Sequence, residues 1–468
     1  MLLHREFVPG LAIYSYVVGD ETSGGCAVID PTRDVEGYMR VAREQGLRIT
    51  DILETHVHAD FVSGAVELKA RLPHETRIHC SGLGGADWTP PYADAVIGDQ
   101  DEISLGNLRL RALHTPGHTL EHVCWTLFDG TRSDDTPWVL FTGDFLFVGD
   151  VGRPDLLGPE AQQRLAHELY GSVFERIIDL PDFLELFPAH GAGSLCGKAI
   201  GSRESSTLGF ERRFNPSLRH LPEHEWVAAL LRGMPVAPPY FRRMKELNSA
   251  GPRVIGPELP GRKGFSPKEV HERVCVDCLI LDVRAKEAFA AAHIPGSINI
   301  PFGPHLATWA GWVLPYERPI LAVVDSPEEM TEIARCLLRV GFDQIEGYLE
   351  GGLDAWEGRG YELAGLDAVS VHDLARRLQA GDRPFVLDVR TEQEWERGHI
   401  DGAHHIHGGL LQDRLGEVPR DREVAVVCGS GYRASIAASF LKRAGYDPVS
   451  NVIGGMTAST NADLPVST

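Results

Sequence analysis

Basic residues, long apolar runs and paired cysteines are all scarce in this chain of 468 residues. Lys and Arg number 45 against 66 Asp and Glu, and the net charge of −21 speaks against nucleic acid or an anionic membrane surface as the main partner. No apolar run approaches the roughly 20 residues of a membrane span, and no basic region precedes an apolar core at the N-terminus as in a signal peptide. The 8 cysteines are scattered, which excludes a disulfide framework in a chain of this length. We therefore expect a cytoplasmic globular protein with no nucleic-acid or membrane partner.

What the chain does contain is an internal repeat in its second half. Leu281-Asp282-Val283-Arg284 recurs as Leu387-Asp388-Val389-Arg390, and His293-Ile294-Pro295-Gly296 recurs as His399-Ile400-Asp401-Gly402. Within each copy, short apolar runs alternate with helical patterns, which is typical of an α/β fold with a parallel sheet. A stretch rich in Pro and Gly over 251–264 precedes the repeat and is typical of a linker. The sequence therefore predicts three domains, at residues 1–255, 262–365 and 366–468.

In the first domain, apolar runs that look like strands end four times in a loop holding histidine or aspartate. These loop residues are His56, His58 and Asp60, then His118, then Asp144, then His190. Strand ends are where layered α/β folds usually assemble their sites. Imidazole and carboxylate suit iron, zinc or manganese, and two histidines with one aspartate leave the open coordination positions that catalysis requires. The pattern predicts a catalytic metal site, with His114 and His122 outside its ligand set.

In the last domain, Cys428 ends a short apolar strand and opens a loop rich in glycine. The loop continues as Gly429, Ser430, Gly431, Tyr432 and Arg433, and a helical pattern begins at Ala434. A cysteine in this place faces backbone N–H groups and the positive end of a helix dipole, which favours the nucleophilic thiolate. Arg433 adds positive charge that helps to hold an anion. We therefore predict that Cys428 and Arg433 are catalytic and that the rest of the loop binds substrate.

The middle copy has the same framework but carries Asp325 where the last copy has Cys428. The residues that follow, 326–329, make the loop acidic. An acidic loop repels both a thiolate and an anionic sulfur donor, so we predict that this copy is catalytically inactive. Cys275 and Cys278 have CxxC spacing, but no second such pair accompanies them, which favours a structural role.

The histidine and aspartate loops of the first domain resemble the metallo-β-lactamase superfamily, and within it the persulfide dioxygenases. The segments that carry the resemblance are 55–60, 115–119, 142–144, 152–155, 188–191 and 215–216. The resemblance implies an αββα sandwich with one Fe(II) per chain, zinc being the alternative metal, bound by His56, His118 and Asp144. It implies further ligands, or hydrogen-bonding groups around the ligands, at His58, Asp60 and His190. It also makes Arg153, through its planar fork, a candidate for binding a substrate carboxylate.

One position departs from the metallo-β-lactamase pattern. The family usually has His where this chain has Phe61, and members with two zincs use that His in their second site. Phe cannot coordinate a metal, so the change favours a single metal and speaks against a hydrolase with two zincs. Its effect on activity stays open.

The loop of the last domain, together with Asp388-Val389-Arg390 and His399-Ile400-Asp401-Gly402 upstream, resembles the rhodanese family of sulfurtransferases. This resemblance implies two α/β rhodanese-like domains with parallel sheets. It also implies that Cys428 takes up a sulfane sulfur as a persulfide and passes it to a thiol.

The sequence is compatible with three functions. The favoured one is a sulfur-metabolising enzyme, suited to sulfide detoxification. It oxidises a low-molecular-weight thiol persulfide to sulfite at iron and transfers sulfane sulfur at Cys428, with tethering that raises the local concentration of a shared intermediate. The alternative is a zinc-dependent thioester hydrolase of glyoxalase II type fused to a sulfurtransferase. The third, a non-catalytic sulfur-binding scaffold, is suggested only by Asp325. The expected partner is a small persulfide or thiol such as glutathione. The physiological thiol, the direction of sulfur transfer and a homo-oligomeric state stay open.

Overall fold

The computed structural model describes residues 1–73, 75–274, 278–382, 384–462 and 464–467. Cys275 of the CxxC pair lies outside the described residues. The chain forms two compact units, one of Met1–Glu258 with Leu338–Gly341 and one of Leu259–Leu337 with Phe342–Thr468. None of the helices formed by the described residues combines the length and the apolar character needed to cross a bilayer.

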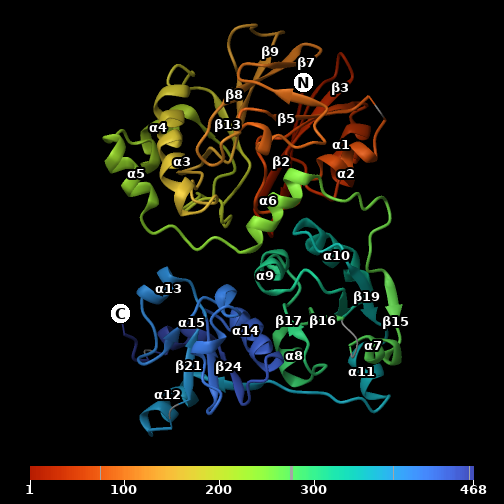
Figure 1. Cartoon of the computed structure of the whole chain (residues 1–468), viewed down its shortest axis with the longest axis vertical. Coiled ribbons are helices and arrows are strands. Elements are labelled where there is room, and N and C mark those ends of the chain that lie inside the picture. Colours follow the sequence, from red (N-terminus) through yellow and green to blue (C-terminus); the bar gives the residue numbers. More distant parts are fainter. Residues whose placement is uncertain (74, 275–277, 383, 463, 468) are drawn as a thin grey trace. The chain divides into compact units, whose positions relative to one another are not determined.

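Two six-stranded sheets build the first unit (Figure 1). The first sheet has the strand order β1 (Leu2–Val8), β2 (Ile13–Asp20), β3 (Gly25–Ile29), β4 (Arg48–Leu53), β5 (Arg77–Ser81) and β6 (Ala95–Ile97). The second has the order β14 (Ser206–Thr207), β13 (Glu185–Pro188), β10 (Val139–Gly143), β9 (Val123–Asp129), β8 (Leu108–His114) and β7 (Glu102–Leu105). A separate pair is formed by β11 (Leu146–Phe147) and β12 (Asp150–Val151).

The two sheets share one apolar core because their strands alternate in polarity. In β8, Leu108 and Leu110 are buried, whereas Arg109 and Arg111, which alternate with them, are partly exposed and cover the ring of Phe128. Successive side chains of a strand point to opposite faces, so such alternation buries one face. The buried side chains meet residues of the first sheet in a single cluster, which includes Tyr16, Val18, Leu53, Trp125 and Phe141.

Helices cover the outer faces of both sheets. They are α1 (Glu36–Glu44) and α2 (Ala65–Ala70) on the first sheet and α3 (Pro159–Gly171), α4 (Leu208–Phe214) and α5 (Glu223–Leu231) on the second. The unit also contains α6 (Tyr240–Ala250). Tyr38 and Leu68 join α1 and α2 to the first sheet, and Leu169 and Trp226 join α3 and α5 to the second. The expected αββα sandwich is therefore confirmed. It brings the loops that follow β4, β8, β10 and β13 together.

The second unit contains two five-stranded parallel sheets with the same topology. In the middle copy the strand order is β15 (Lys263–Phe265), β19 (Ile345–Leu349), β18 (Ile320–Val323), β16 (Leu279–Asp282) and β17 (Ile298–Asn299). In the last copy it is β20 (Asp367–Ser370), β24 (Val449–Ile453), β23 (Val424–Val427), β21 (Phe385–Asp388) and β22 (His404–His405). The parallel α/β sheets predicted from the repeat are confirmed.

Short helices connect these strands. The middle copy has α7 (Pro267–Val274), α8 (Lys286–Ala291), α9 (Leu306–Val313), α10 (Met330–Arg339) and α11 (Gly352–Glu357). The last copy has α12 (Val371–Gln379), α13 (Glu392–Glu396), α14 (Tyr432–Arg443) and α15 (Gly455–Asn461). Helix α14 begins at Tyr432, two residues earlier than expected, so Tyr432 and Arg433 lie in its first turn.

The two copies of the repeat are packed against each other within the second unit. Phe289 of α8 is fully buried in the apolar core of the last copy. Helix α14 contacts β23 and β24 of its own sheet and also β17 of the middle copy. Ser435 of α14 donates a hydrogen bond to the Asn299 side chain of β17 at 2.8 Å. The repeat therefore forms one compact body with two sheets.

Candidate metal centre and cysteine loop

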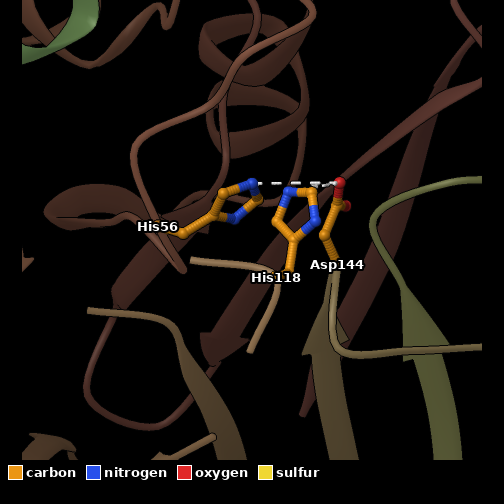
Figure 2. A group of neighbouring side chains, drawn as sticks. All are labelled: His56, His118 and Asp144. Carbon is orange, nitrogen blue, oxygen red and sulfur yellow. Dashed lines mark ion pairs between the residues drawn. The ribbon is translucent and has the colours of Figure 1, made fainter. Parts of the chain in front are cut away.

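His56, His118 and Asp144 converge at the ends of β4, β8 and β10, where Figure 2 shows both imidazoles beside the carboxylate. Oδ2 of Asp144 lies 3.4 Å from Nε2 of His118 and 3.9 Å from Nε2 of His56. All three side chains are buried, and neither these two nitrogens nor the two carboxylate oxygens have a hydrogen-bond partner among the described residues. Buried polar groups are normally paired. Three donors that face one point without partners fit a metal ion, and together they form one of the candidate metal groups of the chain.

Hydrogen bonds on the far side of each ring fix the tautomer that metal binding requires. His118 donates from Nδ1 to the carbonyl of Arg153 at 2.9 Å, so Nε2 is unprotonated and carries a free lone pair. Thr55 donates to Asp30, so the close contact between its hydroxyl and Nδ1 of His56 at 2.9 Å is donated by the ring. Both rings therefore present an unprotonated Nε2 to Asp144, the usual arrangement of metal-bound histidine.

Burial sets the charge of these groups. It lowers the pKa of His56 and of His118 well below the ordinary value, and nearby histidines add to the effect. Both rings are thus neutral near pH 7 and able to bind a cation. Burial also raises the pKa of Asp144 to about 6, because a carboxylate without a cation is costly in an apolar interior.

His122 positions Asp144 through the main chain, a role that the sequence pattern did not reveal. Its Nε2 accepts the backbone N–H of Asp144 at 3.0 Å, and its Nδ1 contacts the Thr115 hydroxyl at 2.8 Å. Burial lowers the pKa of His122 to about 3, so the ring stays neutral and can accept that hydrogen bond. His122 was predicted to lie outside the ligand set, and its Nε2 is occupied by the backbone N–H of Asp144.

Gly152 allows the chain to pass directly behind Asp144. A Cβ atom at this position would lie 1.8 Å from the carbonyl oxygen of Asp144, so the backbone would have to move. We expect Gly152→Ala to displace Asp144 and to weaken metal binding by about 10- to 100-fold, as the loss of a supporting group around a metal does. Titration of the metal-free variant with Fe(II) measures this change.

Gly171→Ala is the matched control for this substitution. No atom lies within 4 Å of the position that its Cβ would take, and Gly171 is the last residue of α3. It should bind metal as the natural chain does. Equal affinity in Gly152→Ala and Gly171→Ala would contradict a positioning role for Gly152.

A second group of buried donors lies on the other side of Asp144. It consists of Asp60, His190 and Cys196, whose ligand atoms are all within 4.8 Å of one another. Nε2 of His190 is 3.4 Å from Oδ2 of Asp60 and 3.3 Å from Oδ1 of Asp144. Burial, and then the charges of Asp60 and Asp144, hold the pKa of the Cys196 thiol well above its ordinary value. Cys196 was not among the predicted ligands, although it lies in the same loop as His190.

His58 is directed away from this centre. Its Nε2 lies 3.1 Å from both Asp30 and Glu54, and its ring packs on Phe61 with centroids 4.4 Å apart. Burial alone would lower the pKa of His58, but the two carboxylates raise it well above the ordinary value. His58 therefore forms an ion pair beside the centre and does not belong to the group around Asp144.

Arg153, the candidate for binding a substrate carboxylate, has partners inside the protein, and its role in substrate binding stays a prediction. The side chain is buried, and its fork pairs with Asp155 at 2.7 and 2.8 Å. Its remaining donors bind the carbonyls of Leu195 and Pro235. The positive charge of Arg153 is therefore neutralised inside the protein by Asp155. The backbone carbonyl of Arg153 supports the centre, because it accepts the hydrogen bond from Nδ1 of His118.

Cys428 directly follows β23 and is fully buried at the start of its loop. The backbone N–H of Gly431 donates to its sulfur at 3.1 Å, as expected for a loop that turns its N–H groups towards an anion. The carbonyl of Cys428 accepts the N–H of Met456 at the start of α15. Cys428 is thus held at the base of the loop by two backbone N–H groups, that of Gly431 at its sulfur and that of Met456 at its carbonyl.

Arg433 lies against this loop, but its fork is already engaged. It binds both carboxylate oxygens of Glu394 at 2.6 and 2.7 Å. Burial raises the pKa of Glu394, but the Arg433 guanidinium outweighs it and brings the value down to about 2. Glu394 therefore fixes the direction of the positive charge beside the loop, and the catalytic role of Arg433 stays a prediction.

The corresponding loop of the middle copy has a different character. Asp325 is exposed, whereas Cys428 is buried, and Glu328 and Glu329 follow it in a short 3₁₀ turn. No thiol stands in the predicted position. The inactivity of this copy stays a prediction, and the acidic loop supports it.

Comparisons with known proteins agree with this arrangement. The metallo-beta-lactamase superfamily matches residues 8–190, and the rhodanese-like domain matches residues 266–359 and 370–462. A crystal structure of a metallo-beta-lactamase from Staphylococcus aureus subsp. aureus COL shares 34% identity with a TM-score of 0.66, covering 75% of this chain and 98% of that one.

Two curated proteins match about half of the chain. Persulfide dioxygenase ETHE1, mitochondrial, from Bos taurus is 34% identical over 219 residues, which is 47% of this chain and 76% of that protein. A beta-lactamase hydrolase-like protein from Agrobacterium fabrum is 30% identical over 285 residues, which is 55% of this chain and 62% of that protein.

Proposed function

The chain belongs to the metallo-beta-lactamase superfamily and carries two rhodanese-like domains, and from this membership we propose that it is a sulfur enzyme with two reactive centres. The first oxidises a low-molecular-weight thiol persulfide to sulfite, and the second transfers sulfane sulfur at Cys428. One observation carries the proposal: the same chain contains both centres. The facing atoms of His56, His118 and Asp144 lack hydrogen-bond partners among the described residues, and the buried Cys428 sulfur accepts a backbone N–H from its own loop. The name of the bovine relative supports the oxidation.

The first reaction balances as one persulfide, one O2 and one water giving one thiol, one sulfite and two protons. Fe(II), when bound, would supply open coordination positions for the persulfide and O2. The chain's own contribution is to keep His56 and His118 neutral through burial and to hold their Nε2 lone pairs on the metal side. Asp144 supplies the anionic ligand, and the buried site keeps bulk water away.

The second reaction transfers one sulfur atom at Cys428. The thiolate attacks the outer sulfur of a donor such as thiosulfate, sulfite leaves with the electron pair of the broken S–S bond, and Cys428 becomes a persulfide. A small thiol then takes the outer sulfur and restores the thiolate. The N–H of Gly431 faces the sulfur that carries negative charge in both steps. A low-molecular-weight thiol such as glutathione is the proposed carrier.

Oxygen uptake tests the first reaction directly. Protein loaded with iron and mixed anaerobically with glutathione persulfide should consume O2 on its addition, with one sulfite formed for each O2. The variant Cys428→Ala should consume O2 at the natural rate in the same assay, because its substitution lies in another domain. No O2 uptake by protein whose iron content is one per chain would refute the dioxygenase proposal.

A thioester hydrolase with two metals is the second candidate. The favouring observation is the second donor group, Asp60, His190 and Cys196, beside Asp144. Zinc-loaded protein that hydrolyses S-lactoylglutathione, while iron-loaded protein takes up no O2 with glutathione persulfide, would favour this alternative.

A further inference from the structure

The middle copy of the repeat has no cysteine in its loop, yet it packs closely against the copy that holds Cys428. Trp309 and Trp312 of α9 lie against the ring of His407, with centroids 6.2 and 4.9 Å away. Gly409 makes room for this contact, because a Cβ atom there would lie 2.0 Å from the Trp312 ring. Both tryptophans are buried, so the two copies hold a fixed position relative to each other at this point.

Two segments of the middle copy contact the cysteine loop itself. The Tyr432 hydroxyl donates a hydrogen bond to the carbonyl of Pro301 at 3.3 Å. The Cε atom of Lys286, the first residue of α8, lies 3.4 Å from the point where a Cβ of Gly431 would stand. Gly431 is the residue whose N–H donates to the Cys428 sulfur. Lys286 therefore places a positive charge beside the residue that holds the reacting sulfur.

Two other basic side chains near this loop supply little net positive charge. Arg433 is neutralised by Glu394, because its fork binds both oxygens of that carboxylate. Burial, and then the charge of Arg433, lower the pKa of His407 to about 4, so its ring is neutral near pH 7. A sulfur oxyanion such as thiosulfate is doubly negative, and N–H donors bind such an anion best together with a cation. Lys286 can supply that cation.

The present partner of Lys286 leaves its ammonium group available to an anion. That group forms an ion pair with the neighbouring Glu287, whose side chain is 72% exposed. Exposed ion pairs contribute little to stability, because water competes for both charges. The Lys286 side chain, itself 31% exposed, can therefore exchange Glu287 for an anion bound at the loop.

We propose that Lys286 of the middle copy binds the oxygens of a sulfur oxyanion donor, thiosulfate above all, while Cys428 attacks its outer sulfur. Sulfite leaves with the electron pair of the broken S–S bond, and Lys286 keeps its protons and stabilises the charge that grows on the leaving group. The copy without a cysteine is thus a working part of the transfer centre. This inference rests on the proposed sulfur transfer at Cys428 and names the class of its donor.

Steady-state kinetics with thiosulfate as donor and the neutral thiol 2-mercaptoethanol as acceptor test the role of Lys286. In full-length Lys286→Gln, kcat/KM for thiosulfate should fall about 10-fold, as the loss of one charged hydrogen bond does. The value for 2-mercaptoethanol should stay within about twofold of the natural one, because that step involves no oxyanion. Lys286→Arg keeps the charge and should restore most of the value for thiosulfate.

Lys268→Gln is the matched control for Lys286→Gln. Lys268 belongs to α7 of the same copy, pairs with Glu272 in that helix, and has a side chain that is 69% exposed. The variant removes the same charge from the middle copy without touching the contacts to the cysteine loop. It should leave both kcat/KM values unchanged.

Sulfite binding reports on Lys286 without turnover. In Cys428→Ser, the affinity for sulfite measured by isothermal titration calorimetry should fall about 10-fold when Lys286→Gln is added. A natural chain that transfers no sulfur would refute the proposed function, and this titration would still test the anion site.

Three outcomes would overturn the role of Lys286. One is an equal kcat/KM for thiosulfate in the natural chain and in Lys286→Gln. Another is an equal fall for thiosulfate and for 2-mercaptoethanol, which would indicate structural damage. The third is an equal affinity for sulfite in Cys428→Ser with and without Lys286→Gln.

Discussion

Cys428→Ser is expected to lower the rate of sulfur transfer from thiosulfate to a thiol by about 1,000-fold or more. Serine fits the space of the buried thiol, but its hydroxyl is not ionised near neutral pH and cannot carry a sulfane sulfur. The fold of the loop should persist, because the N–H of Gly431 can donate to oxygen as it does to sulfur. The measurement is sulfite release from thiosulfate, with circular dichroism to check the fold.

Asp325→Ala is the control, because Asp325 occupies the corresponding place in the middle copy and is exposed. It should leave the rate of sulfur transfer within about twofold of the natural rate, as surface substitutions usually do. A Cys428→Ser protein that transfers sulfur at the natural rate would show that the reactive thiol lies elsewhere.

His118→Ala should remove persulfide oxidation by removing the metal. The substitution leaves His56 and Asp144 with too few donors to hold iron, and we expect the affinity for Fe(II) to fall by more than about 100-fold. O2 uptake with glutathione persulfide should fall with the iron content. Metal analysis after dialysis, together with O2 uptake, measures both quantities on one sample.

His114→Ala is the matched control for His118→Ala. His114 is the last residue of β8, its ring bonds to the carbonyl of Leu120, and it is not part of the group around Asp144. It should keep the iron content and the O2 uptake of the natural chain. If both variants bound iron equally, His118 would not be a ligand. In both variants, sulfur transfer at Cys428 should continue.

Taken together, these variants separate the two centres. If the centres act independently, Cys428→Ser removes sulfur transfer alone and His118→Ala removes oxidation alone. If the two centres share an intermediate, a mixture of the two half-active variants should catalyse the overall reaction more slowly than the natural chain. The reason is that tethering raises the local concentration of the intermediate at the second centre.

Several features of the candidate sites followed from local sequence pattern. His56, His118 and Asp144 could be singled out because each follows an apolar strand and carries a donor that suits a metal. Cys428 could be placed because the strand, the glycines and the helix after it are neighbours in sequence. Strand and helix patterns depend mainly on nearby residues, so these features do not need the tertiary fold.

The partners of individual side chains could not be predicted in this way. Arg153 was expected to bind substrate, but it pairs with Asp155, and Arg433 is held by Glu394 from a different helix. His58 has the spacing of a metal ligand and instead binds Asp30 and Glu54. A buried charged or polar group takes whichever partner the packing brings near, and the sequence does not state which one that is.

The sequence by itself determined the α/β class, the duplicated domain, the three residues that converge on one point and the one copy of the repeat whose loop carries a cysteine. Only the tertiary structure decided that Cys196 lies beside Asp60 and His190, and that the two oxygens of Asp144 face different donor groups. The physical reason is that these loops follow strands of two different sheets. Their distance is set by how the sheets pack on the shared core, and no local pattern encodes it.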